Sequence, residues 1–356
     1  MDYNAYRRKT KPILVGGVGI GGDYPISIQS MTNTDTSDIE ATYAQVLALE
    51  SAGCDIVRIT VPSAEGAKTI SELKHRGVKI PIVADIHFDY RAALAAAASG
   101  ADKIRINPGN IGSRERIREV VSACRERKIP IRIGVNSGSV EASILEKYKA
   151  PTAEALAESA MYHVGILEDF DFRDIAISVK SSDVMTMIRA NKILAERTEY
   201  PIHIGVTEAG ARDMALVKSS IGIGTLLSLG IGDTVRVSLT EDPINEIAAA
   251  KNILRAMGLI GGMNIVSCPT CGRTRIDLIS LLSEFEKRVK SEGLDEKNIK
   301  VAVMGCVVNG PGEAREADVG IAGGVGEGLL FRRGEIIKRV KEDKLIDELI
   351  DEIKRF

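Results

Sequence analysis

Eight short segments rich in β-branched residues recur along the first 240 residues, and they constrain the fold more than any other feature of this chain. The gaps between them have helical content, as in 37–53, the alanine-rich 91–100 and 113–128. Because most gaps have room for one helix and two short loops, consecutive strands are expected to be parallel. The expected strands are 26–32, 55–61, 81–87, 102–109, 130–138, 174–180, 201–208 and 233–240.

This alternation predicts an α/β protein with an N-terminal (β/α)8 TIM-type barrel over residues 1–260. A doubly wound parallel sheet is the alternative, because it has the same alternation but usually fewer strands. The stretch 16–22 contains a formal Gly-x-Gly-x-x-Gly dinucleotide fingerprint. A strand rather than a helix is expected after it, so a hairpin turn is the better interpretation.

The alternation ends at the glycine-rich stretch 256–264, where we expect a domain boundary. Beyond it the sequence predicts a small α/β domain, residues 261–356. Its expected elements are a helix at 275–293, strands at 300–305 and 317–323, and a terminal amphipathic helix at 335–355 with Ile336, Ile337, Val340, Leu345 and Leu349 along it.

The composition is that of a globular protein without a strong attraction to nucleic acid or anionic membranes. Lys and Arg number 47 against 49 Asp and Glu, so there is no large net field. No apolar stretch approaches the roughly 20 residues needed to span a bilayer, and "MDYNAYRRKT" lacks the apolar run of a signal peptide. Five cysteines are too few for a disulfide scaffold, so a cytoplasmic protein with reduced thiols is expected.

The expected barrel strands carry polar residues, although a parallel strand covered on both faces is normally apolar. Residues two apart share one face of a strand, and Ile or Val mostly occupies the other face. The polar set is therefore expected to point into the barrel near the C-terminal strand ends, where barrel active sites lie. Its members are Arg58 with Thr60, Asp85 with His87, Arg105 with Asn107, Arg132 with Asn136, Ser178 with Lys180, and Arg236 with Ser238.

This set has more cations than carboxylates, since Asp85 and Glu208 are the two obvious acidic residues. Mutually neutralising ion pairs are the alternative explanation, because buried charges need partners. An uncompensated group of cations attracts a multiply charged anion, and arginine forks match phosphate oxygens. The sequence therefore predicts a phosphate site, and a diphosphate would fit it. The cations are Arg58, Arg105, Arg132, Lys180 and Arg236.

Three cysteines, Cys268, Cys271 and Cys306, lie in the C-terminal domain, whereas all four histidines precede it. Structural zinc almost always takes four Cys or His ligands, and a thioredoxin-type dithiol would leave Cys306 unused. A [4Fe–4S] cluster fits three thiolates better, and Glu313 is a candidate for the fourth iron. An ordinary exposed loop glutamate is the alternative for Glu313. The other two cysteines, Cys54 and Cys124, are expected to be buried structural thiols.

Five motifs together resemble the 4-hydroxy-3-methylbut-2-enyl diphosphate synthase family. They are "SCPTCGRT" and "MGCVVNGPGEA" in the second domain, and "ADIHFDY", "RINPGN" and "IGVNSGS" in the barrel. The resemblance covers essentially the whole chain and matches the two-domain bacterial form. It implies that the second domain is an iron–sulfur domain like those of nitrite and sulfite reductases, with one [4Fe–4S] cluster per chain.

The resemblance also implies a reaction. The family reduces 2-C-methyl-D-erythritol 2,4-cyclodiphosphate to 4-hydroxy-3-methylbut-2-enyl diphosphate in the non-mevalonate isoprenoid pathway, with electrons from reduced flavodoxin or ferredoxin. By match, the cluster ligands would be Cys268, Cys271, Cys306 and Glu313. The diphosphate would be bound by Arg58, His87, Arg105, Arg132, Asn136, Lys180, Arg236 and Ser238.

Glu208 matches a barrel glutamate of the family and is a candidate proton donor for the departing hydroxyl. The alternative is that Glu208 pairs with a neighbouring cation. The family further implies a head-to-tail homodimer with active sites shared between chains. The residues alone leave two other functions open: a non-redox barrel transferase, for instance of the pterin type, with a structural metal clip, and a non-enzymatic iron–sulfur carrier or sensor.

Overall fold

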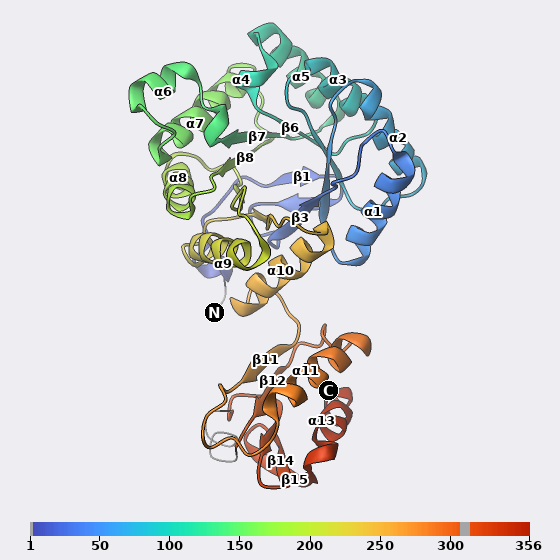
Figure 1. Ribbon diagram of the computed structural model, residues 1–356. Coiled ribbons are helices and arrows are strands. Elements are labelled where there is room, and N and C mark those ends of the chain that lie inside the picture. Colours follow the sequence, from blue (N-terminus) through green and yellow to red (C-terminus); the bar gives the residue numbers. More distant parts are fainter. Residues whose placement is uncertain (1–2, 307–313) are drawn as a thin grey trace. The chain divides into compact units, whose positions relative to one another are not determined.

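The computed structural model describes residues 3–306 and 314–356, and the chain forms two compact units, Met1–Ile253 and Leu254–Phe356. The first unit is a parallel eight-stranded barrel surrounded by helices (Figure 1). Its strands follow the order β8-β7-β6-β5-β4-β3-β10-β9, and a bridge between Ile177 and Ile202 joins β8 to the segment leading into β9. The prediction of a TIM-type barrel is confirmed.

The barrel strands lie within the segments expected from the sequence. They are β3 (Ser27–Met31), β4 (Ile56–Thr60), β5 (Ile82–Asp85), β6 (Lys103–Ile106), β7 (Ile131–Asn136), β8 (Ile175–Lys180), β9 (His203–Ile204) and β10 (Thr234–Val235). The last two are only two residues long, and residues 205–208 and 236–240 of their predicted segments continue as loops at the C-terminal end of the barrel.

Helices alternate with the strands along the chain and form the outer layer (Figure 1). They are α1 (Ile39–Ser51), α2 (Lys68–His75), α3 (Tyr90–Ala98), α4 (Pro108–Ile111), α5 (Arg114–Arg127), α6 (Ala142–Tyr148), α7 (Ala153–Asp169), α8 (Val184–Arg197), α9 (Arg212–Ser228) and α10 (Pro243–Ala256). Asp38, Asp89 and Asp183 cap the N-termini of α1, α3 and α8 by accepting backbone N–H bonds.

The glycine-rich stretch 16–22 belongs to a hairpin, as predicted. β1 (Ile13–Val15) pairs antiparallel with β2 (Val18–Ile20). Apolar residues of the hairpin pack against Ile56, Val83 and Ala176, which lie at the N-terminal ends of their strands. The hairpin therefore covers the N-terminal end of the barrel, and the C-terminal end remains for a site.

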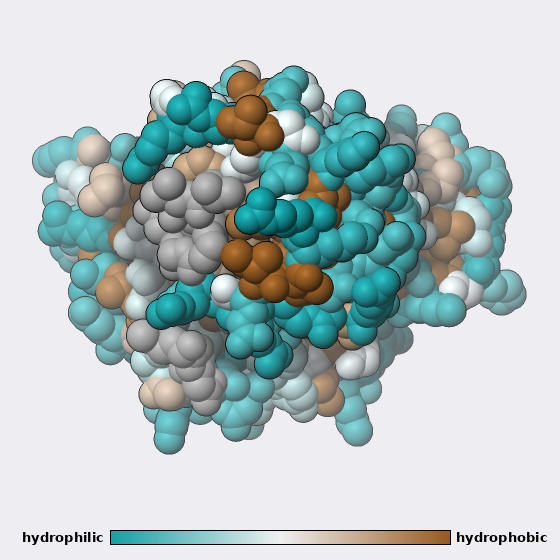
Figure 2. All heavy atoms as spheres, turned by 90° about the horizontal axis from the view of Figure 1, so that it is seen from below, coloured by the Kyte–Doolittle hydropathy of each residue, from teal (hydrophilic) through white to brown (hydrophobic). Residues whose placement is uncertain are grey.

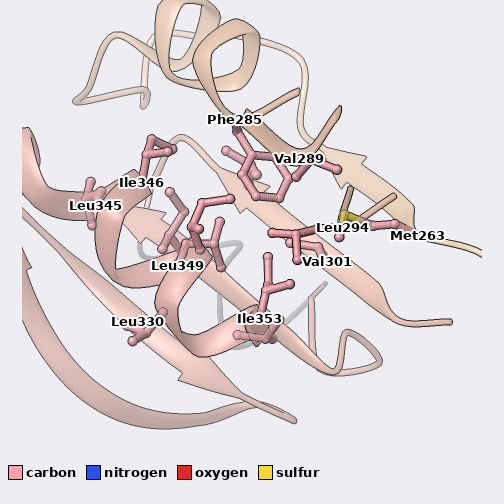
Figure 3. Close-up of a cluster of buried hydrophobic side chains, with 14 of the residues drawn as sticks. Met263, Phe285, Val289, Leu294, Val301, Leu330, Leu345, Ile346, Leu349 and Ile353 are labelled. Carbon is pink, nitrogen blue, oxygen red and sulfur yellow. The ribbon is translucent and has the colours of Figure 1, made fainter. Parts of the chain in front are cut away.

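The second unit is a mixed five-stranded sheet with the order β11-β12-β13-β14-β15. Its strands are β11 (Asn264–Ser267), β12 (Lys300–Met304), β13 (Val319–Gly323), β14 (Glu327–Arg332) and β15 (Glu335–Lys341). The helices α11 (Leu278–Ser291) and α13 (Leu345–Lys354) contribute Phe285, Leu349 and Ile353 to a buried cluster with residues of the sheet (Figure 3). This cluster is the hydrophobic core of the unit.

The prediction of one terminal helix over 335–355 is wrong in its first part. Residues 335–341 form the strand β15, which pairs antiparallel with β14 through a tight turn containing Arg333 and Gly334, both with positive φ. Ile336 and Ile337 are exposed, and only Val340 of this strand is buried. Because the turn returns the chain along β14, cross-strand pairing outweighs the helical spacing of the apolar residues.

On the face shown in Figure 2, hydrophilic residues predominate and hydrophobic residues gather in a few groups. Among the residues that the structure describes, no helix is both long and apolar enough to cross a bilayer.

Candidate active site

A charged pocket lies inside the barrel at the C-terminal ends of the strands. It encloses about 90 Å³. Seven of the eight residues predicted to bind the diphosphate line it: Arg58, His87, Arg105, Arg132, Asn136, Lys180 and Arg236. Asp85, Gly134, Ser178 and Thr207 complete the lining. The strand alternation therefore brings together residues of five strands, β4 to β8, and of the segments that follow β5, β9 and β10.

Two buried carboxylates hold three of the arginines. Asp85 Oδ1 lies 3.0 Å from Arg105 Nη1, and its Oδ2 lies 3.6 Å from Arg58 Nε. Glu246 on α10 lies 3.3 Å from Arg236 Nη2 and also accepts hydrogen bonds from the Ser30 hydroxyl and the backbone N–H of Leu239. These contacts orient the arginines toward the barrel interior.

The pocket retains an excess of positive charge. Three of its five cations form ion pairs with two carboxylates, Asp85 and Glu246, so among the described residues the cations of the pocket outnumber their carboxylate partners by three. Arg132 and Lys180 form no ion pair with a carboxylate among the described residues, and each is at most 6% exposed. Mutual neutralisation by ion pairs, the alternative explanation for these charges, therefore holds for only part of the five cations.

This excess appears in the acid–base properties of the pocket. Burial and then the neighbouring cations hold the pKa of Lys180 well below its usual range. Burial also lowers the pKa of Arg58 to about 10, although Asp85 acts in the opposite direction. Burial alone would raise the pKa of Asp85, but Arg58 and Arg105 outweigh it and lower this pKa to about 2. A bound anion would relieve the repulsion among these cations.

Several predicted residues lie beside the pocket rather than in its lining. Ser238 is half-buried two residues beyond Arg236, and Glu208 is exposed next to Thr207 with a positive φ of 51°. Asn107 is buried, but its side chain caps α4 by accepting from the Gly109 N–H. Glu208 forms no ion pair with a described residue, so the ion-pair alternative for it is not supported in this part of the chain.

Four further charged or polar residues inside the barrel were not predicted from the sequence as site residues. They are Gln29, Lys103, His203 and Glu246, each at most 4% exposed. Gln29, Lys103 and His203 are polar interruptions in predicted strands, so the signal that marked the other residues was available for them. Glu246 lies on a helix, and no strand pattern could have indicated it.

A larger cavity of about 460 Å³ lies near the N-terminal segment and the ends of α7 and α8. Arg8, Lys9, Lys11 and Arg197 line it together with Glu168, Glu196 and Glu199. The charges of this cavity nearly cancel. Its lining includes residues 198–200, which precede β9, so the cavity lies away from the C-terminal strand ends where barrel active sites are found. The smaller pocket is therefore the better candidate for binding an anion.

In the second unit, the three predicted cysteine ligands follow two neighbouring parallel strands. Cys268 comes directly after β11, Cys271 follows three residues later, and Cys306 comes after β12. The backbone N–H of Gly305 points to Cys268 Sγ at 3.3 Å, and the Arg275 N–H donates to the Gly305 carbonyl. The loop 268–275 is thereby attached to the end of β12 beside Cys306.

The donor set suits an iron–sulfur cluster. Three thiols without a disulfide lie at one edge of the sheet, and an N–H group directed at a sulfur is a feature of such sites. Among residues 3–306 and 314–356, no three His, Cys, Asp or Glu side chains converge closely enough to hold a metal ion. Glu313, the predicted fourth ligand, lies outside the described residues.

The remaining cysteines behave as structural thiols. Cys54 and Cys124 are both buried in the barrel unit. Burial raises the pKa of each thiol to about 12, so both stay protonated and unreactive at neutral pH. This agrees with the expectation from the sequence.

Together, a barrel with an anion pocket and a small unit with three cysteines at a sheet edge define a class of two-domain α/β enzymes. The family model described as the GcpE TIM-barrel domain matches residues 10–251, and that described as the GcpE protein C-terminal domain matches residues 264–355. The chain belongs to the GcpE family.

Curated relatives agree over nearly the full length. A protein of Clostridium perfringens named 4-hydroxy-3-methylbut-2-en-1-yl diphosphate synthase (flavodoxin) is 59% identical over 97% of this chain and 98% of its own length. A Clostridium acetobutylicum protein of the same name is 58% identical over 98% of this chain and 99% of its own. The resemblance inferred from the motifs is confirmed.

Solved structures with a similar fold cover about 70% of this chain. Dihydropteroate synthase from Thermus thermophilus has a TM-score of 0.50 at 13% identity and covers 70% of this chain and 99% of its own. The Bacillus subtilis spore coat polysaccharide biosynthesis protein spsE has the same TM-score at 12% identity, over 70% of this chain and 74% of its own. At these identities the likeness supports the fold alone.

Proposed function

We propose that this protein catalyses the reductive ring opening and dehydroxylation of 2-C-methyl-D-erythritol 2,4-cyclodiphosphate to 4-hydroxy-3-methylbut-2-enyl diphosphate, a step of the non-mevalonate isoprenoid pathway. The name of its relatives and the whole-chain match support this reaction. The observation that carries the proposal is the barrel pocket, where, within residues 3–306 and 314–356, five cations meet two carboxylates. Such a pocket favours a ligand with several negative charges.

In this proposal the cations of the pocket hold the diphosphate. Arg58, Arg105, Arg132, Lys180 and Arg236 donate to its oxygens, and His87, Asn136 and Ser238 contact it from the rim. The same cations stabilise the negative charge that develops on the phosphate when the ring C–O bond breaks. A cavity of about 90 Å³ is below the roughly 300–1,000 Å³ of ordinary ligand sites, so the carbon portion extends past the rim.

Glu208 is the proposed proton donor. Its carboxyl group is exposed next to Thr207, which lines the pocket, and so it can reach the part of the substrate that extends outward. Protonation by Glu208 would let the hydroxyl depart as water. Glu208 can act as the proton donor although its side chain is exposed in the free protein.

The second unit is proposed to hold one [4Fe–4S] cluster through Cys268, Cys271, Cys306 and Glu313. The cluster would supply electrons one at a time to the substrate, and a carboxylate ligand would be displaceable from the fourth iron. Reduced flavodoxin is the proposed electron donor, as the name of the relatives suggests, and ferredoxin is the alternative. Free thiols as ligands support a cytoplasmic location.

We also propose a homodimer in which each active site is shared between the two chains. An apolar stripe on α9 supports an interface between chains, since Met214, Val217 and Ile221 are each at least 50% exposed. These residues have the spacing of one helix face. Exposed apolar patches of this kind mark interaction sites.

The transferase alternative is not supported. The GcpE C-terminal domain model matches residues 264–355, and the relatives named as the synthase cover nearly the whole chain. A non-enzymatic iron–sulfur carrier would not explain the cations of the barrel pocket.

Product analysis tests the proposed reaction. The anaerobic holoenzyme is incubated with the cyclodiphosphate and reduced flavodoxin, and the phosphorus NMR spectrum is followed. We expect conversion to 4-hydroxy-3-methylbut-2-enyl diphosphate in the wild type, loss of conversion in Cys268→Ser, and unchanged conversion in Cys124→Ser, a buried thiol outside the site. If the wild type with a full complement of iron leaves the cyclodiphosphate intact, the proposed reaction is wrong.

A further inference from the structure

The arginines of the barrel pocket are held in two different ways. Arg58 and Arg105 contact the carboxylate of Asp85, and Arg236 contacts that of Glu246. Arg132 is held instead by two uncharged groups, because its Nη1 lies 3.0 Å from Gln29 Oε1 and 3.0 Å from His203 Nδ1. All three residues of this second arrangement are at most 2% exposed.

The strand order explains why Gln29 meets Arg132. Gln29 lies on β3 and Arg132 on β7, which are four strands apart in either direction around the barrel. The two strands are therefore on opposite walls, and the side chains meet in the interior. His203 on β9 reaches the same Nη1 from a third strand. Such a contact across the barrel fixes the guanidinium in place.

The hydrogen bond from Arg132 determines the tautomer and the charge of His203. A guanidinium nitrogen only donates hydrogen bonds, so His203 Nδ1 must accept, and the ring is neutral with its proton on Nε2. Burial and then the charges of Arg132, Lys180 and Lys103 hold the pKa of His203 well below its usual range, which agrees with a neutral ring. Gln29 likewise accepts through its amide oxygen.

We propose that Gln29 and His203 are positioning residues that orient the Arg132 guanidinium without cancelling its charge, so that Arg132 offers a full positive charge to the anion in the pocket. This inference rests on the proposed diphosphate site. A carboxylate in either position would also orient Arg132, but it would compete with the ligand oxygens for the guanidinium. Neutral acceptors avoid that competition.

The decisive variant is Gln29→Glu. It changes the side-chain volume little and keeps an acceptor for Arg132 Nη1, so the fold and the melting temperature should be retained. The added carboxylate should weaken binding of the anion by about tenfold or more, because it competes with the ligand oxygens for a charge-assisted hydrogen bond from Arg132. Asn252→Asp makes the same amide-to-carboxylate change on the exposed part of α10 and is the matched control.

A second pair of variants tests His203. His203→Leu removes the acceptor, whereas His203→Asn places an amide oxygen near the position of Nδ1. We expect His203→Asn to bind at least about fivefold more tightly than His203→Leu. This rescue would not follow from a purely structural role, since both variants remove the ring. The pair also decides the matter if Gln29→Glu does not fold.

The measurement is isothermal titration calorimetry of the anaerobic holoenzyme with the cyclodiphosphate and, separately, with inorganic pyrophosphate, together with thermal unfolding. Weaker binding by Gln29→Glu at an unchanged melting temperature supports the inference, and equal binding by Gln29→Glu, Asn252→Asp and the wild type overturns it. A wild type that binds pyrophosphate but not the cyclodiphosphate would contradict the proposed function, while the variants still test the inference on pyrophosphate. Binding of neither ligand would overturn both.

Discussion

Gly134 gives the Arg105 guanidinium its place in the pocket. A Cβ atom on residue 134 would lie 2.4 Å from Arg105 Nε and 2.7 Å from its Nη2, so any side chain must displace this guanidinium. Because the obstacle is the end of a flexible side chain, Arg105 would move and the strand would remain. A single methyl group at this position thus perturbs the site more than the fold.

We predict that Gly134→Ala weakens binding of the cyclodiphosphate by about tenfold, as expected for one misplaced charged hydrogen bond. The melting temperature should change little. Calorimetric titration with the substrate checks this, with Gly138→Ala as control, because a Cβ there would meet no atom within 4 Å. Equal affinities in the two variants would show that Arg105 is not in its binding position.

Lys180 should take up protons when the anion binds. Burial and the neighbouring cations lower the pKa of Lys180 in the free protein, so this lysine loses its proton at a lower pH than an ordinary lysine does. An anion favours the charged form and raises this pKa, so binding adds protons. Titrations near pH 8 in buffers of different ionisation enthalpy should therefore report net proton uptake, and Lys180→Met should reduce it. Net proton release would contradict the charge analysis.

At the scale of elements, α11 and α13 stabilise the second unit through one buried cluster (Figure 3). Phe285 on α11 is fully buried there, whereas Ile279 on the same helix is 71% exposed. Phe285→Ala should lower the free energy of unfolding by about 3–5 kcal/mol. Ile279→Ala should change it by no more than about 0.5 kcal/mol. Chemical denaturation of both variants checks the difference, and similar losses would place the core elsewhere.

The strands of the barrel could be predicted from the sequence, because β-branched runs and their polar alternate positions reflect local geometry. The segment 335–341 could not, because its apolar spacing fits a helix and only pairing with β14 makes it a strand. Glu246 could not be predicted as a site residue for a related reason. It lies on a helix, and packing of that helix rather than strand alternation brings it to Arg236. Tertiary contacts decide both cases.

At the scale of the whole molecule, the α9 stripe predicts a dimer in solution. Val217 is 51% exposed at the centre of the stripe. We expect Val217→Glu to convert the dimer into a monomer in sedimentation analysis, because a buried charge without a partner disfavours the interface. Lys192→Glu, an exposed change on α8, is the control and should remain dimeric. A wild type that is monomeric and fully active would refute the shared site.

We propose that the anion pocket and an iron–sulfur centre act on the same substrate. The most direct measurement is the visible spectrum of the anaerobically purified protein, with iron and sulfide analysis, before and after addition of the cyclodiphosphate. We expect a brown protein with about four irons and four sulfides per chain and a spectrum that changes on adding the substrate. A colourless protein that contains zinc, with a spectrum indifferent to the cyclodiphosphate, would contradict it.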